Sequence, residues 1–197
     1  MILVGLTGGI GSGKTTVINI FKELNIPTYI ADEAGKKLMD TSTEIREQIV
    51  KLLGQESYQK SVPNRKYIAS KVFNDGALLK QLNSIIHPAV ANNFKQWVAK
   101  QKADYVVYEA AILFESGNYK QFDYTILVTA PKEIRIQRLL ERDASSREEI
   151  ESRMNNQWTD DRKRKLASFE IQNVNFLETK DQTLHLNEII LKSIKNY

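Results

Sequence analysis

The chain contains no cysteine. This absence excludes disulfide bridges, thiolate zinc sites and cysteine nucleophiles together. Also missing are internal repeats, low-complexity segments and any apolar run near the roughly 20 residues that a membrane helix needs. No basic leader precedes the first apolar run. We therefore expect a cytoplasmic protein that contacts no membrane.

The size and composition are ordinary for a globular protein. The chain has 197 residues, of which 42% are hydrophobic and 26% charged, and this predicts one domain over residues 1–197. The formal charge of +4 suits either nucleic acid or small polyanions. The densest basic run, residues 162–165, follows two aspartates and has no aromatic ladder. We interpret it as a solvated helix face and expect no nucleic-acid partner.

The most specific motif is GGIGSGKT at residues 8–15, which fits the pattern G-x-x-x-x-G-K-[ST] at every position. An apolar run at residues 2–6 predicts a buried strand before it, and apolar residues at helical spacing follow it. In such a loop several backbone N–H groups converge on phosphates at the start of the next helix. The sequence therefore predicts ATP or GTP binding.

The residue types in this loop suggest individual roles. Lys14 should reach the outer phosphates, and the Thr15 hydroxyl should be a ligand of Mg²⁺. Thr16 should contact an inner phosphate. The remaining nucleotide contacts expected in the loop are Gly9, Gly11, Ser12 and Gly13.

Acidic residues follow two further predicted strands. Asp32 comes after residues 28–31, and Glu109 comes after residues 105–108. Ligands of open parallel sheets bind at the carboxyl ends of strands, so either acid is a candidate site residue. Asp32 equally suits the N-cap of a helix over residues 33–39. Glu109 matches a loose pattern in which an acid positions Mg²⁺ through water.

Residues 43–102 have an almost entirely helical pattern, which is more helix than one crossover between parallel strands needs. We interpret residues 35–102 as a helical insertion that covers a second substrate. His87 and Pro88 are expected to break the helical run, with Pro88 beginning the next helix. His87 either contacts a ligand or only orients that turn.

The last part of the chain returns to alternating strands and helices. Residues 123–129 predict a core strand, and the helix after it carries Arg138 and Arg142 on one face. Ser146 with Glu149 has capping-box spacing and predicts a second helix. We interpret residues 139–157 as a mobile lid that brings arginines to a phosphoryl group. A short strand at residues 169–171 and an amphipathic helix complete the pattern.

These elements predict an α/β fold of the three-layer P-loop NTPase type, with a parallel sheet, a helical substrate-binding insertion and a helical lid. The core would comprise residues 1–34, 103–138 and 158–197. The apolar segment that contains Leu113 and Phe114 fits either buried core or the floor of a pocket.

One ordered set of motifs resembles the dephospho-CoA kinase family over nearly the whole chain. The resemblance rests on residues 5–15, 31–32, 87–88, 113–117 and 138–143, together with Gln157. The chain departs from the family pattern at Ala111, where proline is usual, and at Ser168, where aspartate is usual.

The resemblance implies transfer of the γ-phosphoryl group of Mg²⁺-ATP to the 3′-hydroxyl of dephospho-CoA, the final step of coenzyme A biosynthesis. It implies that Asp32 is the base or the carboxylate that orients this hydroxyl. The implied catalytic residues are Lys14, Asp32, Arg138 and Arg142. Asn173 would contact ATP, and dephospho-CoA would contact Asp32, His87, Glu109, Leu113 and Phe114.

Three other readings remain open at this point. A nucleic-acid binding module is suggested only by the basic isoelectric point. A kinase of another small acceptor, such as a nucleoside monophosphate, should lack the motifs at residues 31–32 and 87–88 in this order. A GTPase switch should carry an Asn-Lys-x-Asp motif, and this sequence has none. We expect a monomer or a weak homo-oligomer.

Overall fold

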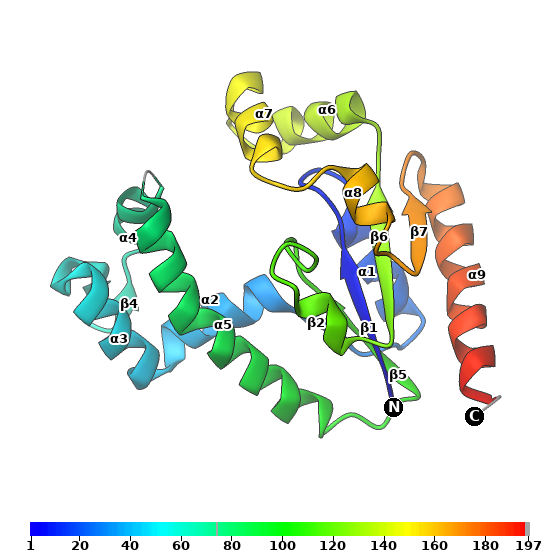
Figure 1. Cartoon of the computed structure of the whole chain (residues 1–197), viewed down its shortest axis with the longest axis horizontal. Coiled ribbons are helices and arrows are strands. Elements are labelled where there is room, and N and C mark those ends of the chain that lie inside the picture. The colour runs from blue at the N-terminus through cyan, green and yellow to red at the C-terminus, as the bar shows by residue number, and fades with distance from the viewer. Residues whose placement is uncertain (74, 196–197) are drawn as a thin grey trace. The chain divides into compact units, whose positions relative to one another are not determined.

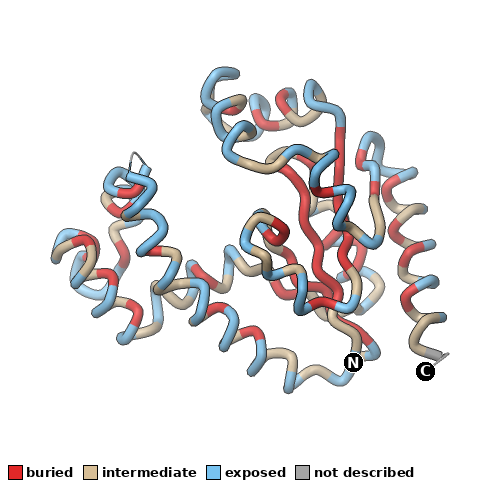
Figure 2. Tube along the Cα trace, viewed as in Figure 1, coloured by how far each residue is buried: buried red, intermediate tan, exposed pale blue. Residues whose placement is uncertain are grey.

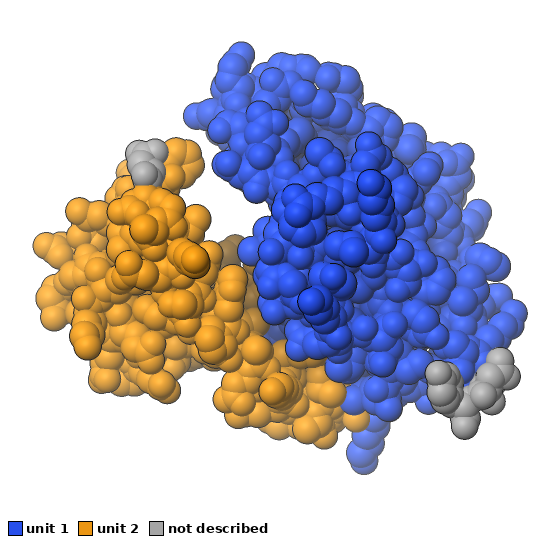
Figure 3. Space-filling model, in the orientation of Figure 1, with its two compact units in different colours: residues 1–29, 102–197 blue, residues 30–101 orange. Residues whose placement is uncertain are grey.

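The structure is a computed structural model that describes residues 1–73 and 75–195. It divides into two compact units, which Figure 3 shows in separate colours. One unit comprises Met1–Tyr29 with Lys102–Tyr197, and the other comprises Ile30–Gln101. Among the described residues no helix is long and apolar enough to span a membrane.

The first unit is built on a five-stranded sheet with the order β2-β5-β1-β6-β7. The middle strand β1 pairs in parallel with β5 and with β6, and β6 pairs in parallel with β7. The strand bounds are Ile2–Thr7 for β1, Thr28–Ile30 for β2, Tyr105–Glu109 for β5, Tyr124–Thr129 for β6 and Phe169–Gln172 for β7. The predicted α/β fold with a parallel sheet is confirmed.

Helices flank this sheet, as Figure 1 shows. Helix α1 contacts α9 and β5, α9 also contacts β7, and the short helix α8 contacts β6. The bounds are Lys14–Glu23 for α1, Lys132–Arg142 for α6, Arg147–Asn155 for α7, Asp160–Arg164 for α8 and Phe176–Lys195 for α9, with a 3-10 turn η2 at Asn118–Gln121. The predicted capping box is confirmed, since Ser146 and Glu149 make both of its hydrogen bonds.

The core of the first unit lies along the three middle strands, which are largely buried in Figure 2. Residues 105–107 and 126–128 are fully buried. Strands of parallel sheets are covered on both faces, so they appear in the sequence as continuous apolar runs. This pattern made the strands predictable.

The second unit is mainly helical. Its bounds are Ala31–Thr41 for α2, Thr43–Leu53 for α3, Arg65–Val72 for α4 and Gly76–Val98 for α5, with a 3-10 turn η1 at Gln55–Ser57. It has its own apolar cluster, which includes Ile45, Ile49, Ile68 and Leu82. A hairpin of β3 (Tyr58–Gln59) and β4 (Val62–Pro63) interrupts the helices. The sequence shows no strand pattern for this hairpin, because each strand is only two residues long.

The predicted helix break at Pro88 is wrong, because α5 continues through it from Gly76 to Val98. Proline inside a helix removes one backbone donor and costs about 3 kcal/mol. Buried Leu82 before the proline and buried Val90 and Phe94 after it keep both halves packed. Packing on both sides offsets the local cost.

Candidate active site

The GGIGSGKT loop lies between β1 and α1, at the carboxyl end of the middle strand. Gly11 and Gly13 have φ angles of 78° and 89°, which disfavour residues with a Cβ atom. A Cβ atom on Gly8 would lie 2.3 Å from the Val128 carbonyl oxygen. The loop therefore needs glycine at positions 11 and 13 for their positive φ angles, and at position 8 because the loop packs against the backbone of β6.

Lys14 and Glu109 meet at this end of the sheet. The parallel register pairs Leu6 with Glu109, so the Glu109 carboxylate lies beside the start of the loop. Lys14 Nζ lies 3.8 Å from Glu109 Oε1, and it donates a hydrogen bond of 3.1 Å to the Gly8 carbonyl. Both side chains are mostly buried. The lysine thus folds back over the loop.

The residues predicted to hold Mg²⁺ have the chemistry that the ion prefers. Thr15 offers an exposed hydroxyl in the first turn of α1, and Glu109 offers a carboxylate at the end of the neighbouring strand. Mg²⁺ in such sites takes one or two protein oxygen atoms and keeps several waters or phosphate oxygens. The residues present therefore fit the ion.

Side chains from distant segments hold the outer side of the loop. The Gln157 Oε1 atom accepts a hydrogen bond of 2.8 Å from the Ile10 N–H, and Arg135 Nε donates 2.9 Å to the Ile10 carbonyl. The Ile10 side chain packs against the buried Ile136, Leu139 and Ile150 of α6 and α7. The predicted lid region is thus joined to the loop through Ile10.

Of the two predicted lid arginines, the structure brings Arg138 to the loop. Arg138 Nη2 donates 3.3 Å to the Val174 carbonyl, and a Cβ atom on Gly13 would lie 3.6 Å from Arg138 Nη1. Nη1 is buried and has no hydrogen bond among the described residues. A buried guanidinium N–H without a partner beside a phosphate loop is suited to an anionic ligand.

Arg142 instead pairs with the neighbouring residue Asp143, at 2.8 Å from Nε. Arg153 of α7 also reaches Asp143, at 3.2 Å. Hydrogen bonds from Arg142 and Arg153 lower the pKa of Asp143 to about 2. In this arrangement the Arg142 guanidinium is exposed and engaged with an acid of its own segment.

Asp32 and His87 belong to the second unit. Asp32 is the second residue of α2, whose N-cap is Ile30 without a side-chain hydrogen bond. The capping reading of Asp32 is therefore wrong, and its carboxylate is exposed in the first turn of the helix. His87 is exposed on α5 within the continuous helix.

Leu113 and Phe114 are each only 1% exposed. Leu113 packs so closely on the sheet that a Cβ atom on Gly5 would lie 2.7 Å from its Cδ2. The structure favours the core reading for this pair. A direct contact with substrate stays a prediction.

The basic run at residues 162–165 is not wholly a solvated face. Lys163 is fully buried and pairs with Glu115, so the interpretation is wrong at that residue. Arg162 lies over the Trp158 ring, and Arg164 pairs with Glu170. No periodic pattern in the sequence distinguished Lys163 from its neighbours, because its partner Glu115 lies 48 residues earlier in the chain.

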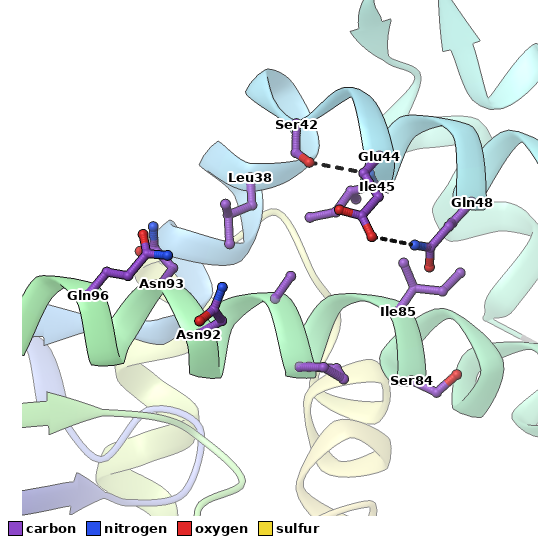
Figure 4. A pocket seen from close by; sticks show the side chains of 12 residues that line it. Leu38, Ser42, Glu44, Ile45, Gln48, Ser84, Ile85, Asn92, Asn93 and Gln96 are labelled. Atoms are coloured by element: carbon purple, nitrogen blue, oxygen red, sulfur yellow. Dashed lines mark hydrogen bonds between the residues drawn. The ribbon is translucent and has the colours of Figure 1, made fainter.

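The second unit contains a groove of about 360 Å³ between α2–α3 and α5, shown in Figure 4. Apolar side chains, hydroxyl groups and side-chain amides line it. Glu44, its one charged lining residue, accepts a hydrogen bond from Gln48. The lining residues are Leu38, Ser42, Glu44, Ile45, Gln48, Ser84, Ile85, Pro88, Ala89, Asn92, Asn93 and Gln96.

A parallel sheet with a complete phosphate loop at its middle strand, and a lysine and a carboxylate beside that loop, defines a nucleotide-binding protein of the phosphate-loop class. The profile of the dephospho-CoA kinase family matches residues 2–178. The chain belongs to the dephospho-CoA kinase family, whose members are ATP-dependent kinases.

Individual relatives agree with this membership. Dephospho-CoA kinase of Porphyromonas gingivalis is 42% identical over 154 residues, which cover 78% of this chain and 76% of the relative. The crystal structure of TT1252 from Thermus thermophilus has a TM-score of 0.87 at 30% identity and covers 95% of this chain and 96% of that one. Dephospho-CoA kinase from Campylobacter jejuni has a TM-score of 0.72 at 26% identity, covering 97% and 98%.

Proposed function

We propose that this chain transfers the γ-phosphoryl group of ATP to the 3′-hydroxyl of dephospho-CoA, giving CoA and ADP. The observation that carries the proposal is the complete phosphate loop at the end of β1 in a chain whose family match spans residues 2–178. The substrates would be ATP and dephospho-CoA. We also propose a cytoplasmic enzyme that is a monomer or a weak homo-oligomer.

We assign the phosphate chemistry to residues of the first unit. Lys14 would leave the Gly8 carbonyl and neutralise charge on the outer phosphates. Thr15, and Glu109 through water, would hold Mg²⁺, which when bound neutralises charge on the β- and γ-phosphates. Arg138 and Arg142 would stabilise the equatorial oxygens of the transferring group. Arg142 must first leave Asp143.

We assign the acceptor chemistry to the second unit. Asp32 would accept the proton of the 3′-hydroxyl while that oxygen bonds to the γ-phosphorus and the bond to ADP breaks. Its exposed carboxylate, which caps no helix, supports this role. The largely uncharged groove of α2, α3 and α5 supports binding of an amide-containing acceptor, because its side-chain amides complement the amide groups of dephospho-CoA.

A coupled assay of ADP release tests the proposal. Dephospho-CoA would be compared with nucleoside monophosphates and small alcohols at equal concentration, with product analysis of the phosphorylated position. We expect turnover with dephospho-CoA and phosphate at its 3′ position. Phosphorylation of AMP or CMP without turnover of dephospho-CoA would assign the chain to another acceptor.

A further inference from the structure

Asn173 lies in the loop that joins β7 to α9 and is only 4% exposed. Its backbone N–H donates 2.8 Å to the Thr129 carbonyl and so extends the β6–β7 ladder by one residue. Its side-chain Nδ2 donates 2.9 Å to the Ser12 carbonyl and lies 3.5 Å from the Gly13 carbonyl. A strand-end residue thus binds the outer side of the phosphate loop.

The chemistry of the neighbours determines which way the Asn173 amide points. Backbone carbonyl oxygens only accept hydrogen bonds, so the NH₂ group must face Ser12 and Gly13. The Thr179 hydroxyl lies 3.0 Å from Asn173 Oδ1 and 2.7 Å from the Asn175 carbonyl, and Thr179 is fully buried. The opposite orientation would place three oxygen atoms together. The two loop carbonyls therefore fix the orientation of the amide.

Gly13 and Asn173 also fit each other sterically. A Cβ atom on Gly13 would lie 1.8 Å from Asn173 Nδ2, so the amide occupies the volume that any side chain at position 13 would fill. Gly13 has a φ angle of 89°, which favours glycine on its own. The Asn173 amide can lie this close to the loop only because Gly13 has no side chain.

We propose that Asn173 is a positioning residue that orients the last two peptide groups of the phosphate loop. In a planar trans peptide the C=O and N–H groups point to opposite sides. Holding the Ser12 and Gly13 carbonyls on the outer side directs the N–H groups of Gly13 and Lys14 toward the inner side, where phosphates bind. The Gly13 carbonyl also accepts 3.0 Å from the Thr16 N–H, which keeps it directed into α1.

This inference rests on the nucleotide-binding role of the loop and replaces a direct contact of Asn173 with ATP by an indirect one. The two roles differ in what they recognise. A residue that orients loop N–H groups affects every ligand that carries the phosphates. A residue that contacts the base or ribose affects only ligands that have a base or ribose.

Calorimetric titration with two ligands tests the proposal, each in the presence of Mg²⁺: ADP and inorganic tripolyphosphate. In Asn173→Asp the carboxylate faces two carbonyl oxygens, donates no hydrogen bond and adds a negative charge near the phosphates, so we expect both ligands to bind at least about tenfold more weakly and by similar factors. Asn173→Ala should give a smaller loss, again for both ligands. No acceptor substrate is present, so the result does not depend on dephospho-CoA turnover.

Asn175→Ala is the matched control. Asn175 Oδ1 accepts 2.9 Å from the Glu178 N–H and caps the start of α9, two residues from Asn173. Its loss should lower the melting temperature and leave both affinities unchanged. Weaker ADP binding with normal tripolyphosphate binding in Asn173→Asp would overturn the proposal in favour of a base or ribose contact. Normal binding of both ligands in Asn173→Ala, which adds no charge, would overturn it as well.

Thr179 provides a second route if the Asn173 variants do not fold. Thr179→Val removes the hydroxyl that faces Asn173 Oδ1 and should weaken both ligands by a few-fold, whereas Thr179→Ser keeps the hydroxyl and should restore wild-type affinity. Equal affinities in these two variants would then count against the proposal.

Discussion

The Lys163 ammonium lies 2.9 Å from the Glu115 carboxylate, with the lysine side chain fully buried. Lys163 Nζ has no hydrogen bond of good geometry among the described residues, and neither has Glu115 Oε2. Glu115 Oε1 also accepts 3.1 Å from the Trp158 N–H. The acid therefore joins the segment after β5 to the segment that returns from the predicted lid.

Breaking this pair should destabilise the protein strongly. Glu115→Gln leaves a buried ammonium without its counter-charge, and we expect a loss of about 3–5 kcal/mol in the free energy of unfolding. Glu115→Gln combined with Lys163→Met should recover much of that loss, because both charges are gone. Urea denaturation of each variant measures the difference.

Glu141→Gln is the control for this prediction. Glu141 is exposed on α6 and accepts a hydrogen bond from Gln137, so its change should stay within about 0.5 kcal/mol. Similar unfolding midpoints for Glu115→Gln and Glu141→Gln would show that the buried pair does not stabilise the fold.

Lys14→Ala should lower kcat by about 10²–10³-fold, because it removes a preorganised charge from the transferring phosphates. The fold should persist, since Lys14 contacts the Gly8 carbonyl of the loop and the Glu109 carboxylate, both at the ligand-binding end of the sheet. Steady-state turnover and the melting temperature are the two measurements. Near-normal turnover at unchanged stability would remove Lys14 from the mechanism.

Asp32→Asn should lower kcat by about 10²–10⁴-fold and leave the Kd for ADP nearly unchanged, because an amide keeps the shape but accepts no proton. The neighbouring exposed acid supplies the control: Glu33→Gln should be nearly silent. The N-cap position of α2 is Ile30, and Asp32 lies inside the first turn, so loss of a helix cap cannot explain a lower kcat in Asp32→Asn. A wild-type kcat in Asp32→Asn would refute the base assignment.

Arg142→Lys should lower kcat far more than it weakens ATP binding, because a lysine does not reproduce the planar guanidinium fork on a phosphoryl group. An arginine that stabilises such a transition state contributes about 10³–10⁵-fold to kcat. Arg138→Lys should behave similarly or more mildly. Single-turnover rates at saturating substrates measure both effects.

Arg153→Lys serves as the lid control. Arg153 also pairs with Asp143 but has no assigned role in the chemistry, and exposed ion pairs contribute little to stability. We expect a wild-type rate. If Arg138→Lys, Arg142→Lys and Arg153→Lys all turn over at that rate, the lid arginines only balance local acids.

Sequence patterns identified the features that depend on neighbouring residues. The loop at residues 8–15, the strands of the sheet and the Ser146 capping box follow from spacing, apolar runs and cap chemistry, which act over a few residues. The same local rules misjudged Pro88, and they left Asp32 open between an N-cap and a site residue. Proline disfavours a helix locally, but packing along α5 outweighs this cost at Pro88. Asp32 is not an N-cap, because α2 already begins at Ala31.

By itself the sequence determined the α/β class, the phosphate loop and membership of the kinase family, because each is written in contiguous motifs and their order. Only the tertiary structure decided which distant side chains support that loop. Asn173 reaches Ser12 across 161 residues, Gln157 reaches Ile10 across 147, and Lys163 is buried against Glu115. Such pairs form only when segments far apart in the sequence pack together, and neither hydrophobic periodicity nor helix and strand propensity predicts which segments do so.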